Sequence, residues 1–196
     1  MKANSLAPAR ALLALILALA LLATACASRP SDCCPCPAEG QLSKELLLQL
    51  ASVRALHHKA DMLLKVGDKP GALVAVRQIL LLDLNNRWPE AEEARLDAAA
   101  RLAKLLLDMG QADEALKETE KGIEGVTRDS FYLSNLHSVR GEVLEQQVKV
   151  LDSGGMKEEA RSMARQAIAA FELSIAINKR LQDKLGKGAA VTEESK

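Results

Sequence analysis

The sequence predicts an all-α protein built from antiparallel helical hairpins, and three observations support this prediction. From Ser43 onward, apolar residues recur at spacings of three and four, as on one face of an amphipathic helix. The period-two alternation that is typical of strands is almost absent. The breaks between the periodic stretches are short and carry turn residues, so successive helices are expected to pack side by side as hairpins.

Six apolar stripes follow one another along the chain, and each predicts one helix. In order they are Leu46 to Leu63, Ala72 to Leu80, Leu96 to Leu106, Ala115 to Ile123, Leu136 to Leu151 and Ala160 to Leu181. The last stripe is expected to bury Ala160, Ala164, Ala167, Phe171, Ile175 and Leu181. The helix boundaries fall at Gly67-Asp68 with Pro70 just inside the next helix, Asn85-Asn86 with Pro89, Gly110, Asp129-Ser130 and Ser153-Gly154-Gly155.

The hairpins share a pattern that resembles the tetratricopeptide repeat. Gly67 and Gly110 are each followed, after four residues, by Ala-Leu, and an alanine (Ala60, Ala103) stands seven residues before each glycine. The third unit departs from the pattern, because Gly141 takes the place of the alanine and the turn is delayed to Gly155. The resemblance implies a short right-handed solenoid of about three irregular repeats over residues 43–185. Residues 186–196 are mostly polar and lack periodicity, so they are expected to form a disordered tail.

The first residues have the layout of a secretory signal. Lys2 and Arg10 precede an apolar run from Ala11 to Ala25, which at about fifteen residues is shorter than the roughly 20 that a permanent membrane span requires. The stretch that ends in Cys26 resembles the lipobox of bacterial lipoproteins, although alanine stands where leucine is commonest. This resemblance implies that residues 1–25 are a lipoprotein signal peptide and that Cys26 is lipidated. Since Ala27 follows in place of an aspartate retention signal, it also implies anchoring in the outer membrane, facing the periplasm.

Residues 26–42 are expected to form a flexible tether rich in cysteine and proline. Cys33 and Cys36 could form a local disulfide in an oxidising compartment, which would leave Cys34 as a free thiol. The alternatives are an intermolecular disulfide, and redox or metal handling by these three cysteines. The stretch lacks the strand and helix that activate a redox Cys-x-Pro-Cys motif, and it lacks further ligands for a tetrahedral metal site. No metal or other cofactor is therefore expected.

Composition argues against several function classes. The chain has 26 basic and 26 acidic residues, and loss of Lys2 and Arg10 with the signal would leave 24 against 26, a net charge of −2. With aromatic residues at only 2% as well, nucleic acid is not expected as a partner. The three histidines are not spaced as in zinc proteases, and no nucleophile or phosphate-loop motif is present. We therefore do not expect an enzyme.

The tetratricopeptide resemblance implies a groove that binds a peptide or a helix and is lined by the first helix of each repeat. Carried over position by position, the lining residues are Arg54, His57, Asp61 and Lys65, then Asp97, Ala100, Lys104 and Asp108, then Asn135, Ser138, Glu142 and Glu145. The expected function is therefore a lipid-anchored scaffold or adaptor that binds a protein of an envelope machine for assembly, secretion, pilus formation or wall building. A solvated polar face is the competing interpretation of these residues. A small-ligand binder, which would need a closed apolar pocket, is a further alternative.

Overall fold

A computed structural model describes residues 43–84 and 88–193 of the chain, with side chains described as far as residue 186. All of these residues belong to one unit, Leu42–Lys196. The fold of the described part is all-α, as predicted. Its helices are α2 (Lys44–Lys65), α3 (Lys69–Leu80), α4 (Pro89–Asp108), α5 (Ala112–Ile123), α6 (Phe131–Ser153) and α7 (Lys157–Glu193).

Side-chain caps and prolines account for several of the helix starts. Ser43, Asp68 and Ser130 each accept a hydrogen bond from the backbone N–H three residues later, at 2.8 to 3.1 Å. Pro70 and Pro89 lie in the first turns of α3 and α4, where a missing N–H removes no helical hydrogen bond. The breaks predicted from the sequence therefore coincide with the observed starts of these helices.

The turns within the three hairpins have the same geometry. Gly67, Gly110 and Gly155 have φ values of 82°, 77° and 78°, a region that glycine enters without steric cost. In each turn the glycine N–H donates to the carbonyl three residues earlier, and the next N–H donates to the carbonyl five residues earlier, at 2.9 to 3.0 Å. This is the Schellman ending of a helix, and it allows the chain to reverse within a few residues.

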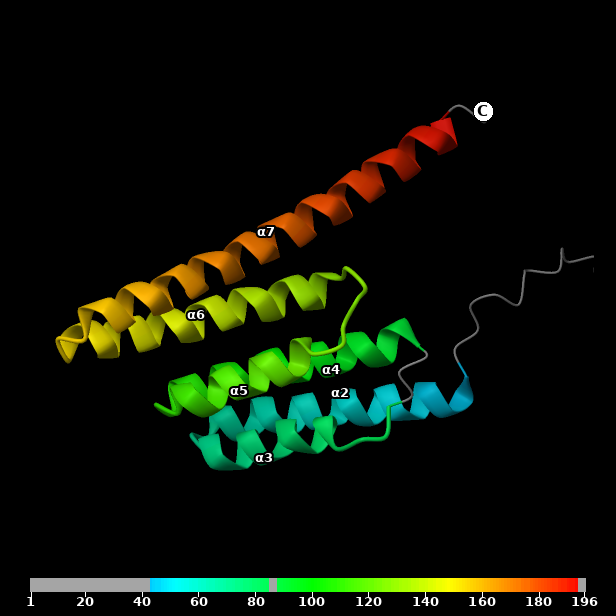
Figure 1. The fold of residues 1–196 in the computed structure, drawn as a ribbon. Helices are drawn as coiled ribbons and strands as arrows, with labels where there is room; N and C mark the ends of the chain where they lie inside the picture. The colour runs from blue at the N-terminus through cyan, green and yellow to red at the C-terminus, as the bar shows by residue number, and fades with distance from the viewer. Residues whose placement is uncertain (1–42, 85–87, 194–196) are drawn as a thin grey trace, which may run out of the picture. The chain divides into compact units, whose positions relative to one another are not determined.

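Each hairpin packs against the first helix of the next one. Helix α2 pairs with α3, α4 with α5, and α6 with α7, as Figure 1 shows. Helix α4 also packs against α3 and α6, and α6 also packs against α5. The central helix α4 is consequently buried on most of its circumference, including Leu96, Ala98, Leu102 and Leu105.

Small residues at equivalent positions of the three first helices are buried. Ala60 and Ala103 are completely buried in the first two hairpins. In the third hairpin, a Cβ atom placed on Gly141 would lie 2.6 Å from Cε1 of Phe171 on α7. The lack of a side chain at Gly141 therefore allows the Phe171 ring to pack directly on the backbone of α6.

The buried face of α7 differs from the predicted stripe. Ile175 is 67% exposed, whereas Ser174 and Ile177 are buried. Two successive steps of four, from Ala167 to Phe171 to Ile175, drift away from the 3.6-residue period of a helix. The predicted stripe does not include Ser174, because serine is polar. Its burial is explained by Ser134 on α6, whose hydroxyl lies 3.0 Å from both the hydroxyl and the backbone carbonyl oxygen of Ser174.

Helix α7 also runs past the predicted boundary at Gly186 and ends at Glu193. No proline interrupts this segment, and its two glycines, Gly186 and Gly188, cost a helix only about 1 kcal/mol each. The helix is tied to the loop before α6 by Arg180, whose guanidinium donates to both carboxylate oxygens of Asp129 at 2.7 and 2.8 Å. Residues 194–196 of the predicted tail lie outside the described residues.

Replacing Gly141 with alanine should destabilise the protein by about 1 to 3 kcal/mol, because the added methyl group would overlap the Phe171 ring. The measurement is the free energy of unfolding from urea titrations. Gly186→Ala is the matched control: a Cβ there meets nothing within 4 Å, and the better helix propensity should stabilise α7 slightly. Equal stability of the two variants would contradict the close contact.

Candidate functional site

The predicted site residues fall into two groups. Cys26, Cys33, Cys34 and Cys36 lie outside the described residues, so lipidation and a disulfide remain predictions. The predicted groove residues all lie on the first helices of the hairpins, α2, α4 and α6. Their positions are Arg54, His57, Asp61 and Lys65 on α2, Asp97, Lys104 and Asp108 on α4, and Asn135, Ser138, Glu142 and Glu145 on α6.

Charged side chains of α2 and α4 meet between these two helices. The Nε2 atom of His57 lies 3.4 Å from Oδ2 of Asp97. The Nδ1 atom of His57 lies 3.2 Å from Nη1 of Arg101, and Nη2 of the same guanidinium donates to the carboxylate of Asp61. Four side chains from two helices therefore form one network. Only Arg101 was absent from the predicted lining, although its position one turn after Asp97 on α4 places it on the same face.

The network changes the proton affinities of its members. Burial lowers the pKa of His57, and the carboxylate of Asp97 partly opposes this effect. The hydrogen bond from Arg101 lowers the pKa of Asp61. Since its pKa lies below 6.5, the imidazole of His57 is neutral at neutral pH, and it lies between the side chains of Asp97 and Arg101.

A second contact extends the same face from α4 to α6, where Nζ of Lys104 lies 3.7 Å from Oε2 of Glu142. Beyond these pairs, Arg54, Lys65 and Asp108 are exposed, whereas Asn135 is partly buried. The prediction that Ala100 lines the groove is wrong, because this side chain is only 2% exposed. It points into the helix packing because α4 has neighbours on most sides. We refer to the charged surface of α2, α4 and α6 as the first-helix face.

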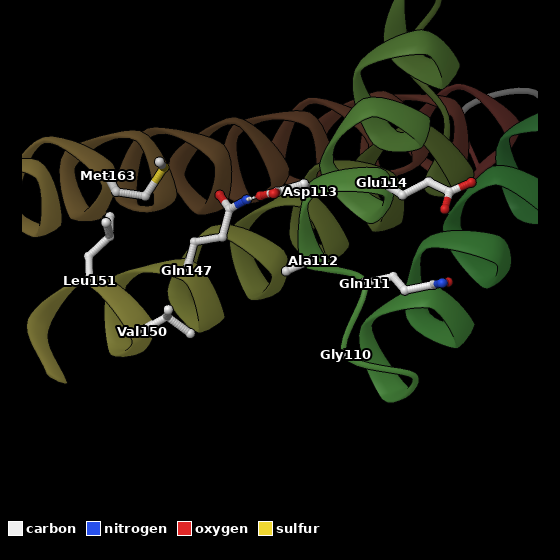
Figure 2. Close-up of a pocket in the computed structure, with 9 residues that line it drawn as sticks. All are labelled: Gly110, Gln111, Ala112, Asp113, Glu114, Gln147, Val150, Leu151 and Met163. Atoms are coloured by element: carbon white, nitrogen blue, oxygen red, sulfur yellow. Dashed lines mark hydrogen bonds between the residues drawn. The ribbon is translucent and has the colours of Figure 1, made fainter. Parts of the chain in front are cut away.

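A pocket of about 510 Å³ lies between the turn that joins α4 to α5, the end of α6 and the start of α7. Figure 2 shows the side chains of Gln147 and Asp113 pointing toward one another, and Nε2 of Gln147 donates to Asp113 at 2.8 Å. Apolar contributions come mainly from α6 and α7, through Val150, Leu151 and Met163. The pocket is open to solvent, so it lacks the enclosed apolar volume that a small-ligand binder would need.

Other kinds of site find little support in the described part of the chain. Among residues 43–84 and 88–193, no three histidine, cysteine or acidic side chains are placed to hold a metal ion. Within the same ranges, no helix is long and apolar enough to span a bilayer. The network around His57 has an acid and a base, but it has no serine, cysteine or threonine nucleophile among its four members.

Comparison with known proteins adds no assignment. No protein-family model matches the chain, and a search of curated proteins finds no match either.

Two histidines should make the stability of the domain depend on pH. Burial lowers the pKa of both His57 and His137, and for His137 the positive charge of Arg140 adds to this effect. Near pH 6.5 the two histidines therefore bind protons more readily in the unfolded chain than in the folded protein. The free energy of unfolding should consequently fall as the pH drops from about 7.5 to 5.5. Chemical denaturation at several pH values measures this slope.

Replacing His57 and His137 together with glutamine should flatten the slope over that interval. His58→Gln, at an exposed position next to His57, is the control for the loss of a histidine as such. If the double variant kept the full pH dependence, the two buried imidazoles would not be its source.

Proposed function

We propose that this chain is a non-catalytic scaffold, tethered by lipid at Cys26 to the periplasmic side of the outer membrane, that binds a protein of an envelope machine. In this proposal the three hairpins form a short tetratricopeptide-like solenoid, and the first-helix face is the surface that contacts the partner. The common turn geometry and the small residues at the helix crossings support the repeat interpretation.

The observation that supports the partner surface best is the arrangement of charges on the first-helix face. The polar contact of His57 with Asp97, the ion pair of Arg101 with Asp61 and that of Lys104 with Glu142 join α2 to α4 and α4 to α6, and they orient these side chains before any partner binds. Side chains that are already ordered lose less entropy on binding. Mixed charges in fixed positions favour specificity and fast association with a complementary surface.

Membrane attachment depends on Cys26 in this proposal. Cys26→Ala should move the protein from the membrane fraction to the soluble periplasmic fraction, because stable anchoring needs acyl chains that only the cysteine can carry. Fractionation followed by mass spectrometry of the mature N-terminus measures the change. An unmodified residue at the start of the wild-type mature chain, or retention of Met1, would contradict the anchor.

Partner binding can be tested at residues whose replacement leaves the ion pairs intact. Arg54→Glu combined with Lys65→Glu reverses two exposed charges on α2. We expect binding of the cross-linked envelope partner to fall about tenfold or more, since like charges brought together at an interface cost more than about 1.4 kcal/mol. Lys117→Glu with Lys157→Glu, on α5 and α7, makes the same change in net charge away from this face. Equal partner recovery from both double variants would contradict the first-helix face as the binding surface.

A further inference from the structure

In the described part of the chain, helix α7 has no counterpart of one neighbour that both other second helices have. Helix α3 packs against α2 and α4, and α5 packs against α4 and α6, so each lies between its own partner and the first helix of the next hairpin. Among the described helices, α7 packs only against α6. In Figure 1, α7 accordingly lies at the edge of the helical stack. The described residues therefore leave uncovered the side of α7 that corresponds to these inter-hairpin contacts.

The exposed residues on this side are apolar. Leu80, Ile123 and Ile168 occupy the same place in their helices, counted from the turn glycine of each hairpin. Leu80 and Ile123 are partly buried and pack against the main core, whereas Ile168 is 56% exposed. Ile175 lies two turns further along the same side of α7 and is 67% exposed. Large apolar side chains in such positions differ from the polar outer face that terminal repeats usually have.

Charges at the hairpin junctions indicate what should cover this side. Arg77, Glu120 and Arg165 also share one place relative to their turn glycines. Arg77 forms an ion pair with Glu114 of the next hairpin, and Glu120 accepts from Arg140 of the next hairpin at 3.3 Å. At both junctions this place contacts an opposite charge on the following hairpin, which comes from its second helix α5 for Arg77 and from its first helix α6 for Glu120. Arg165 occupies the same place on α7, where the described residues include no following hairpin.

We propose that α7 binds an amphipathic helix of another protein, which packs its apolar stripe on Ile168 and Ile175 and places an acidic side chain against Arg165. Lys179 is exposed one turn beyond Ile175 and favours a second acid at the other end of that stripe. Glu172 lies between the two isoleucines on the same side and disfavours an acid at the centre. The partner helix is thus apolar along one face, with acids near both ends of that face.

A second copy of this chain fits the surface less well. Its first helix α2 would take the position of a following first helix, as α6 does after α5. Lys59 comes directly before Ala60 on α2, just as Arg140 comes directly before Gly141 on α6. Lys59 of the second copy would therefore take the position that Arg140 has relative to α5. It would then face Arg165, and the two positive charges would repel each other. The inference depends neither on the lipid anchor nor on the first-helix face.

The test uses two synthetic helical peptides that share a leucine stripe with i, i+3, i+7 spacing. One carries glutamates at the two ends of the stripe and the other carries lysines at the same positions. Fluorescence anisotropy with the full chain measures binding. The acidic peptide should bind at least ten times more tightly than the basic one, and Ile168→Glu with Ile175→Glu should weaken its binding more than tenfold.

Arg165→Glu should reverse the preference in favour of the basic peptide, which a general loss of folding could not do. Val74→Glu, at a site on α3 that is 53% exposed, is the control and should leave binding unchanged. Equal affinity for both peptides, or equal loss of binding in the control, would overturn the proposal. Concentration-dependent dimerisation that Ile168→Glu abolishes would also overturn it, in favour of a second copy.

Discussion

The close approach of paired helices is the constraint on which the other packing depends. Two helices can lie close together only where the residue at their crossing is small, and Ala60, Ala103 and Gly141 meet this requirement in the three hairpins. At the third crossing, the ring of Phe171 occupies the space where a Cβ atom of residue 141 would be. The close crossings hold each hairpin together and thereby place its first helix against the preceding hairpin.

Electrostatic contacts join the hairpins where apolar packing ends. The first two hairpins are linked along one face by the network of His57, Asp61, Asp97 and Arg101. The second and third hairpins are linked by Lys104 and Glu142. On the second helices, Arg77 and Glu120 make the corresponding contacts forward along the chain. Exposed pairs of this kind contribute little to stability, so their main effect is to orient side chains on the surface.

The helices could be predicted well because their signals are local. Apolar periodicity, caps and turn glycines act within a few residues, and the observed breaks follow them closely. The predictions failed where a residue's environment depends on distant packing. Ala100 is buried by neighbouring helices, and Ser174 is buried because it hydrogen-bonds with Ser134. Ile175 is exposed because α7 packs only against α6 among the described helices. The network around Arg101 also needed the pairing of α2 with α4, which no local pattern specifies.

The position of α4 has a consequence for how the domain comes apart. This helix packs against four others, α2, α3, α5 and α6, whereas the first hairpin makes no packing contact with α6 or α7 among the described helices. Local unfolding of α2 and α3 can affect the third hairpin only through its effect on α4. Cooperativity in such a stack extends only as far as the nearest-neighbour contacts carry it. Either end can therefore open transiently by itself while the rest of the domain stays folded around α4.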